Sequence, residues 1–226
     1  MERGKATKLM VPVLLVLLVL ATPAAAAPPI TDTFGRPNGP IGVTDTGQTW
    51  LQTNSTWAVE SNHARVTTRT ASGYATVQIA SASAFVVEAN IRLSSTFRRA
   101  NAGLTVLWRN AANHIFCKIE VTSGRPTGLM SIGRKLNNVT ASLLAFRAGT
   151  GFVNGQTYRV ACSRSGNRLT MTVSGGNLLS SLSVGYTLTS ADLAAFGTAR
   201  GAGLRSRFAS DEDDGGSTWD DFRVTA

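Results

Sequence analysis

The chain has few of the residues that most often carry metal or nucleophilic chemistry. Its 226 residues include only two cysteines and two histidines. His63 and His114 do not fall at ligand spacing with either cysteine, which disfavours a zinc site. The sequence also has no Gly-x-Ser-x-Gly elbow, no His-Glu-x-x-His motif and no Gly-rich phosphate loop before a helix. It therefore lacks the motifs of common serine hydrolases, zinc peptidases and nucleotide-binding enzymes.

Acidic residues are also scarce. The chain has 22 Lys and Arg against 13 Asp and Glu, a formal net charge of +9. Basic chains attract anionic polymers, but these arginines are scattered and only Arg98 and Arg99 are adjacent. The scatter disfavours a specific nucleic-acid site and favours a solvated basic surface, which could still meet an anionic cell-wall polymer.

An apolar run long enough to span a bilayer is missing. Leu9–Leu20 covers 12 residues, whereas a spanning helix needs about 20. The run follows a basic segment and precedes the small residues Ala24–Ala27, so residues 1–27 are predicted to be a cleaved secretory signal peptide. The sequence thus predicts a secreted, extracellular protein without a membrane span, in which residues 28–226 form one domain.

The two cysteines fit this export. Cys117 and Cys162 each lie in an alternating segment with apolar neighbours of the same parity, so both are expected to point into one core. Exported chains oxidise nearby thiols, so a structural disulfide is favoured, and two buried free thiols are the alternative.

The clearest structural signal lies in Ala102–Val121. Apolar and polar residues alternate on both sides of a short polar loop at Asn110–Asn113, which predicts a β-hairpin. The face predicted to be buried comprises Leu104, Val106, Trp108, Ile115, Cys117 and Ile119. The face predicted to meet solvent or a ligand comprises Thr105, Arg109, Phe116, Lys118 and Glu120. This second face is the first place to expect a binding site.

Short alternating segments fill most of the remaining chain. Gly, Pro, Asn and Asp separate them at close intervals, as in antiparallel all-β domains. The predicted strands are Trp57–Val59, Ala64–Thr67, Tyr74–Ile79, Phe85–Leu93, Leu129–Arg134, Ser142–Arg147, Thr157–Ser163, Leu169–Val173, Gly203–Phe208 and Trp219–Val224. By contrast, Thr189–Gly197 predicts a short helical turn, with Ser190 as its cap and Gly197 at its end.

Four motifs occur in a fixed order along the chain: Asp32–Arg36, Thr44–Trp50, Ala102–Arg109 and Trp219–Val224. Together they resemble bacterial concanavalin A-like lectin/glucanase domains, the laminin-G-like jelly rolls. The resemblance covers the chain from about Ile30 to its end. It implies an all-β jelly-roll sandwich of two antiparallel sheets, often with a sugar or polymer on the concave sheet or its rim loops, and sometimes with a structural calcium ion.

Two places are candidates for such a calcium ion, and no other cofactor is expected. The resemblance brings the N-terminal segment close to the last strand, so that Asp32 would lie near Asp220 or Asp221. The acidic run Asp211–Asp214 offers the oxygen ligands that Ca²⁺ prefers. That run does not match an EF-hand loop, however, and such runs are usually solvated.

The enzymes of the similar family need paired carboxylates. Retaining glucanases place Glu-x-Asp-x-Glu or Glu-x-Asp-x-x-Glu on one strand, so that two carboxylates about 5 Å apart share a face. No such run occurs in this chain. Glu88 and Glu120 are the only acidic residues of the predicted central strands, and they would share a face only if their strands were neighbours in one sheet.

The leading hypothesis is therefore a secreted, non-catalytic module that binds a carbohydrate, a glycoconjugate or another cell-surface polymer. A sugar site needs an aromatic platform and planar hydrogen-bonding groups. The candidate ligand-binding residues are Asn90, Arg92, Arg109, Phe116, Lys118 and Glu120. The alternatives are a glycoside hydrolase with an unrecognised carboxylate pair and a structural or adhesive surface protein without a sugar site.

Overall fold

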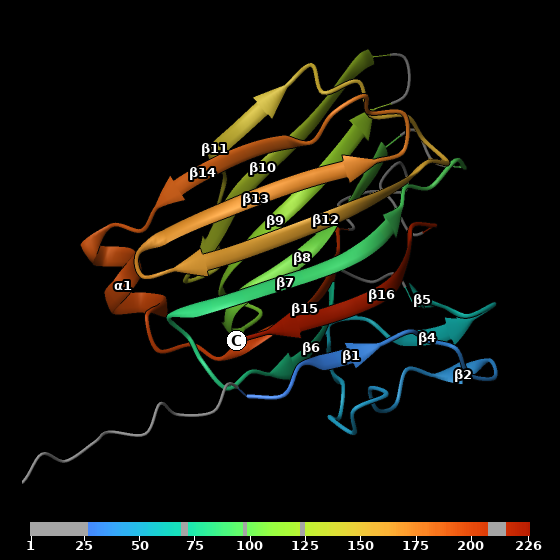
Figure 1. The fold of residues 1–226 in the computed structure, drawn as a ribbon, viewed down its shortest axis with the longest axis horizontal. Helices are drawn as coiled ribbons and strands as arrows, with labels where there is room; N and C mark the ends of the chain where they lie inside the picture. The colour runs from blue at the N-terminus through green and yellow to red at the C-terminus, as the bar shows by residue number, and fades with distance from the viewer. Residues whose placement is uncertain (1–26, 69–71, 97–98, 123–124, 208–215) are drawn as a thin grey trace, which may run out of the picture.

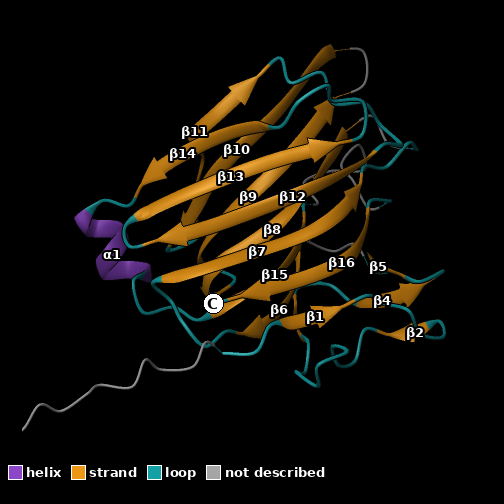
Figure 2. Cartoon of the chain, viewed as in Figure 1, coloured by secondary structure: helices purple, strands orange, loops and turns teal. Residues whose placement is uncertain are grey.

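The computed structural model describes residues 27–68, 72–96, 99–122, 125–207 and 216–226. Two predicted features, the signal peptide up to residue 26 and the acidic run Asp211–Asp214, lie outside these ranges. The described chain forms two antiparallel sheets packed face to face, and in Figure 1 the larger sheet lies in front of the smaller one. Strands supply nearly all of its regular structure (Figure 2). The prediction of an all-β sandwich is confirmed.

The larger sheet has the strand order β14-β13-β12-β7-β16-β5-β4-β2, with β1 paired to β16. Its strands are β1 (Ile30–Asp32), β2 (Gly39–Pro40), β4 (Trp57–Glu60), β5 (His63–Val66), β7 (Ala84–Arg92), β12 (Thr157–Ser165), β13 (Arg168–Gly175), β14 (Leu182–Thr187) and β16 (Thr218–Thr225). Buried and more exposed residues alternate along β7, β12 and β13, as expected when one face of a sheet packs on a core.

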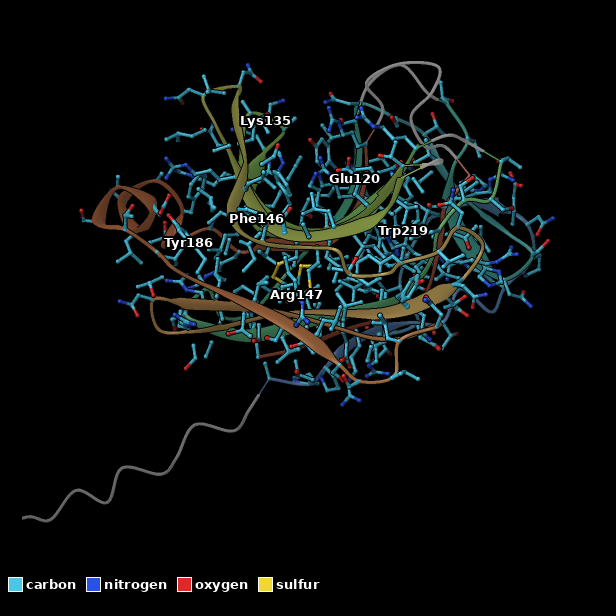
Figure 3. The ribbon with its side chains drawn as sticks, turned by 90° about the horizontal axis from the view of Figure 1, so that it is seen from above. Glu120, Lys135, Phe146, Arg147, Tyr186 and Trp219 are labelled. Atoms are coloured by element: carbon cyan, nitrogen blue, oxygen red, sulfur yellow. A yellow bond between two sulfur atoms is a disulfide. The ribbon has the colours of Figure 1, made fainter. Side chains whose placement is uncertain are left out.

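The smaller sheet has the strand order β11-β10-β9-β8-β15-β6-β3. Its strands are β3 (Leu51–Thr53), β6 (Gly73–Gln78), β8 (Arg99–Asn110), β9 (Asn113–Thr122), β10 (Arg125–Leu136), β11 (Val139–Ala148) and β15 (Gly201–Ser206). The predicted hairpin is confirmed as β8 and β9, in which Leu104 pairs with Cys117 and Thr105 with Phe116. Figure 3 shows this sheet curving, with Glu120 and Lys135 on the face turned away from the larger sheet.

The core between the sheets is held by contacts from both of them. Cys117 of β9 and Cys162 of β12 form a disulfide, so the predicted bond is confirmed and joins the two sheets. Trp219 of β16 donates its indole N–H to the carbonyl of Gly103 in β8, at 3.0 Å. Its ring packs edge-on against Trp57, with centroids 4.9 Å apart. Because Cys117 points into the core, its neighbours Phe116 and Lys118 point out of the sandwich.

A β-bulge reverses the faces of β8 near its end. The register of β8 with β9 shifts between Val106 and Asn110, and Leu107 has a φ of 49°. Leu107 therefore turns into the core, while Trp108 moves to the outer face and packs on Tyr74. The prediction that Trp108 faces the core is wrong, because strict alternation assumes a regular strand and a bulge adds one residue.

The predicted helical turn is present as α1 (Ser190–Phe196) at one end of the sandwich (Figure 2). Its cap is Thr189, and not Ser190 as predicted. Thr189 keeps an extended backbone and its hydroxyl accepts from the Asp192 N–H, while the Asp192 carboxylate accepts from the Thr189 N–H. Within the described ranges, no helix has the length and apolar character needed to cross a membrane.

Candidate functional site

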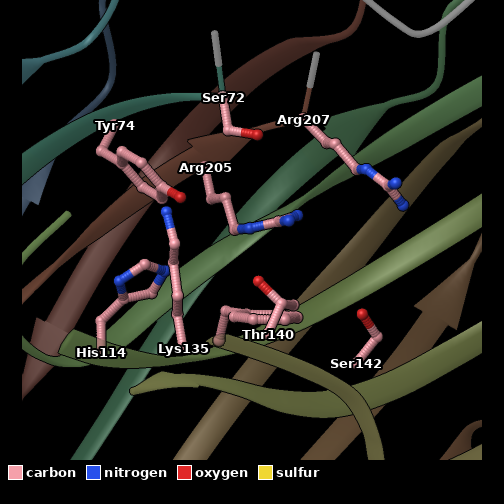
Figure 4. Close-up of a pocket in the computed structure, with 9 residues that line it drawn as sticks. Ser72, Tyr74, His114, Lys135, Thr140, Ser142, Arg205 and Arg207 are labelled. Atoms are coloured by element: carbon pink, nitrogen blue, oxygen red, sulfur yellow. The ribbon is translucent and has the colours of Figure 1, made fainter. Parts of the chain in front are cut away.

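The outer face of the smaller sheet contains a cavity of about 190 Å³. Residues from or beside β6, β9, β10, β11 and β15 line it, so the curvature of the sheet brings five strands to one place. The lining consists of the rings of Tyr74, His114 and Phe116, the cations Lys135, Arg205 and Arg207, and the hydroxyls of Ser72, Thr140 and Ser142. Figure 4 shows the side chains of Tyr74, His114, Lys135 and Arg205 converging.

Four rings form a contiguous cluster on this face. Trp108 lies 4.7 Å from Tyr74 and 4.9 Å from His114, measured between ring centroids, and Tyr74 and His114 are also 4.9 Å apart. Phe116 extends the cluster beyond His114 at 5.9 Å. All four rings are at most 7% exposed, so they pack mainly on one another and give the cavity a rigid aromatic wall.

Phe116 is fixed from below and from above. A Cβ at Gly133 would come within 2.5 Å of the Phe116 ring, so only glycine lets the ring lie flat across β10. The Arg205 guanidinium stacks over the other side, 4.3 Å from the ring centroid. This packing holds a cation at the centre of the cavity wall.

A polar network extends from Arg205 along the sheet. Arg205 donates to the side-chain Oδ1 of Asn101 at 3.1 Å, and the Asn101 side-chain amide N–H donates to Glu120 at 2.9 Å. The same Glu120 oxygen accepts from the Lys118 ammonium at 2.6 Å. Burial alone would raise the pKa of the Glu120 carboxyl, but Lys118, together with Arg207 and Arg99, holds this pKa below its usual value. The Glu120 carboxylate and the Lys118 ammonium therefore form an ion pair with each other.

His114 is a neutral acceptor at this site. Burial, reinforced by the nearby Arg205 cation, lowers the pKa of its imidazole to about 3. Its Nδ1 lies 3.2 Å from the Asn110 carbonyl, which can only accept, so the Nδ1–H donates and Nε2 carries the free lone pair. The cavity therefore takes its charge from Arg and Lys, and His114 offers an acceptor.

Four buried polar atoms on this outer face have no hydrogen-bond partner in the described part of the chain: Thr105 Oγ1, His114 Nε2, Ser131 Oγ and Arg205 Nε. A buried polar group without a hydrogen bond costs about 1–3 kcal/mol. Such groups are normally paired with protein, ligand or ordered water. Their clustering on one face indicates a surface with hydrogen-bonding capacity left for a ligand.

The structure brings together only part of the predicted ligand set. Phe116 lines the cavity, and Lys118 and Glu120 follow it on the same face of β9. Arg109 lies at the far end of β8 and donates to the Ala195 carbonyl of α1 at 2.8 Å.

Asn90 and Arg92 belong to β7, in the other sheet, and so are not neighbours of Phe116. Asn90 donates to Asp221 at 2.8 Å and Arg92 to the Gly155 carbonyl at 3.1 Å. Sequence spacing did not separate these residues from the hairpin because it does not say which strands share a sheet.

Several cavity residues were missed by the sequence analysis. His114 has the same parity as Phe116 in the predicted hairpin, so parity alone would have found it. Arg205 and Tyr74 alternate with core residues of their own predicted strands, but only the pairing of β6 with β15, where they are register partners, shows that they meet. Lys135 lies just beyond the predicted end of its strand.

The one candidate carboxylate pair is not formed. Glu88 lies on β7 in the larger sheet and Glu120 on β9 in the smaller sheet. Glu88 instead pairs with Arg159 at 2.7 Å, on the outer face of its own sheet. The two carboxylates therefore project from opposite faces of the sandwich.

The proposed calcium ligands do not fit an ion. Asp32 is register partner to Phe222 and so lies beside Asp221, as expected. Its buried carboxylate, however, pairs with Arg36 at 2.6 Å and accepts from the Trp50 indole at 2.7 Å, so a cation would have to displace both donors. Across the described part of the chain, no group of three or more Asp, Glu, His or Cys residues could hold a metal ion.

No family model matches the chain, and no curated protein matches it. Solved structures do. The carbohydrate-binding module CBM66 from Bacillus subtilis is 15% identical, with 78% of this chain and 91% of that chain covered and a TM-score of 0.50. Lectin II from Ulex europaeus is 10% identical, with 89% and 99% covered and a TM-score of 0.57. The exoplasmic/lumenal domain of VIP36, in a Ca²⁺/Man2-bound form, is 11% identical, with 87% and 86% covered and a TM-score of 0.59.

The chain has the concanavalin A-like jelly-roll fold. The resemblance read from the sequence motifs is thus confirmed at the level of the fold. At such low identities the likeness shows the fold alone, and fold does not by itself assign function.

Proposed function

We propose that the chain is a secreted, non-catalytic module that binds a polysaccharide or glycoconjugate, with an anionic cell-wall polymer among its possible ligands. The observation that carries the proposal is the cavity on the outer face of the smaller sheet. There, a cluster of aromatic rings adjoins buried polar atoms that have no partner among the described residues. Sugars have apolar ring faces and a rim of hydroxyls, so they can use both features.

Known proteins of this fold support the proposal. The similar structures include a carbohydrate-binding module, a plant lectin and a lectin-like domain in a mannose-containing form. Export is supported by the signal-like residues 1–27 and by the disulfide between Cys117 and Cys162, since such bonds persist in oxidising compartments.

A non-catalytic role is supported by the separation of Glu88 and Glu120. Glycosidases need two carboxyl groups about 5–10 Å apart on facing elements. These two residues lie on opposite sheets. A hydrolase would therefore need a different pair from the one that the central strands offer.

The test is a glycan array probed with residues 28–226, combined with depletion of the protein by insoluble polysaccharides. Phe116→Ala should weaken retention by about 1–3 kcal/mol, the scale of a charged hydrogen bond, because the ring holds the Arg205 guanidinium in the cavity wall. Because Phe116 is buried, this variant also loses stability, so a second variant is needed.

Ser142→Trp fills the cavity from its rim without touching the core, and it should abolish retention. Ser183→Trp is the matched control, because it places the same ring on an exposed position of β14 in the larger sheet. Equal retention of both variants and the wild type would contradict the proposed site. Release of reducing sugar by the wild type, lost in Glu120→Gln, would favour an enzyme instead.

A further inference from the structure

We infer that the cavity recognises an acidic sugar residue, whose anionic group is held between Arg205 and Lys135. The inference rests on the proposed carbohydrate function and adds the charge and size of its ligand.

The charges lining the cavity are of one sign. Its described wall carries Lys135, Arg205 and Arg207, with no carboxylate. Glu120, on the same outer face, is held by Lys118 at 2.6 Å and by Asn101 at 2.9 Å. Within the described ranges, neither Lys135 nor Arg205 forms an ion pair. The described wall of the cavity therefore carries excess positive charge.

Arg205 gives the strongest reason to expect an anion. It is only 5% exposed, and a buried cation is costly unless it is paired and hydrogen-bonded. Its guanidinium hydrogen-bonds to Asn101 and Tyr74 and stacks on Phe116, but its Nε–H has no partner among the described residues. The guanidinium fork suits carboxylates, sulfates and phosphates, and a charge-assisted bond there would offset part of the cost of burial.

The rest of the cavity suits a sugar ring better than a bare ion. His114 Nε2 is a buried acceptor that would repel an anion but can accept from a sugar hydroxyl. Ser72, Thr140 and Ser142 add hydroxyls around the opening. At about 190 Å³ the cavity is smaller than the roughly 300–1,000 Å³ of sites for drug-sized ligands. It would therefore take one sugar unit, at a chain end or on a branch.

The experiment is isothermal titration calorimetry, in which acidic oligosaccharides and their neutral counterparts are titrated into a protein comprising residues 28–226. The probes are a trigalacturonate and its carboxyl-reduced form, and a sulfated and a phosphorylated oligosaccharide, each with its unsubstituted parent. At least one acidic probe should bind ten times more tightly than its neutral partner. This comparison uses the wild type alone, so it does not depend on the folding of a variant.

Lys135→Gln should then weaken the preferred acidic probe about tenfold or more, which is the loss of one charge-assisted hydrogen bond, and leave the neutral partner unchanged. Arg159→Gln is the matched control, because it removes the same charge from an exposed position on the larger sheet. Equal weakening by both variants would indicate non-specific electrostatic attraction to the basic protein and would overturn the inference. Equal affinity for the acidic and neutral members of every probe pair would overturn it too. Binding of neutral glycans alone would leave the proposed function standing. Failure of every glycan to bind would remove the proposed function and the inference with it.

Discussion

Glu120 and Glu88 allow a direct test of whether the polar network of the outer face is structural or catalytic. Glu120 accepts from the Lys118 ammonium at 2.6 Å, and Lys118 is only 3% exposed. Glu88 makes a similar contact with Arg159 at 2.7 Å, but the Arg159 side chain is 54% exposed. The same substitution, Glu to Gln, therefore removes a charge from a buried pair in one case and from a surface pair in the other.

The two substitutions should lower the free energy of unfolding by clearly different amounts. Leaving one partner of a buried ion pair alone costs about 3–5 kcal/mol. The Gln oxygen can still accept a hydrogen bond, so Glu120→Gln should destabilise the protein by about 2–3 kcal/mol. Exposed pairs contribute only about 0–1 kcal/mol, so Glu88→Gln should stay within that range.

The destabilisation caused by Glu120→Gln should decrease as the pH falls. Burial raises the pKa of the Glu120 carboxyl, but Lys118, with help from Arg207 and Arg99, lowers it by more, so the net pKa lies below the ordinary 4.5. A carboxyl whose pKa is lower in the folded state contributes stability that is present above its unfolded pKa and lost as the pH falls through its folded pKa. The difference between wild type and Glu120→Gln should therefore be complete at pH 7 and shrink below about pH 4.5.

Urea unfolding followed by tryptophan fluorescence at pH 7 and pH 4 measures both effects. Equal stability of Glu120→Gln and the wild type at pH 7 would refute the assignment of a buried, stabilising pair. A pH-independent loss would refute the electrostatic cause. Neither substitution should change any turnover, because the two carboxylates lie on opposite sheets.

The disulfide between Cys117 and Cys162 closes a loop of about 46 residues, and the chain-entropy relation gives a stabilisation on the order of 4 kcal/mol for such a cross-link. Reduction of the bond should therefore lower Tm by about 8–16 °C in a calorimetric scan. An unchanged Tm after verified reduction would contradict that estimate. Asp192→Asn should cost about 2–4 kcal/mol, because the buried carboxylate pairs with Arg134 and accepts from Tyr186 and Thr189. Burial raises the pKa of Asp192, but these partners hold it below 3.8, so wild-type unfolding curves should lose this contribution only as the pH falls below that value.

The sequence predicts strands well where alternation is long and regular. Phe85–Leu93 and Thr157–Ser163 became β7 and β12 almost unchanged, because a period of two is imposed by one buried face. The same parity placed Cys117 and Cys162 in one core, where they bond.

Short edge strands left no such signal. The strands β2 (Gly39–Pro40) and β3 (Leu51–Thr53) are too brief for a period to show, and Gly39 and Pro40 themselves favour a turn. Their pairing depends on β4 and β6, which are distant in sequence.

The candidate site was only half predictable for two physical reasons. A single bulged residue, Leu107, moved Trp108 to the outer face of the smaller sheet, and the local alternation of residues does not predict this bulge. The second reason is strand order. Arg205 reaches Phe116 because β15 pairs with β8, whereas Asn90 belongs to a strand of the other sheet.

The outer face of the smaller sheet departs from what stability alone would select. Eight buried side-chain polar atoms lack a partner among the described residues, and four of them lie on this one face: Thr105 Oγ1, His114 Nε2, Ser131 Oγ and Arg205 Nε. At about 1–3 kcal/mol each, they are a large cost for a fold whose net stability is typically 5–15 kcal/mol. A solvated sheet face would avoid this cost with short exposed side chains. A buried arginine stacked on a phenylalanine, beside a neutral histidine, leaves hydrogen bonds for ordered water or a ligand to complete, which is why the ligand is proposed at this face.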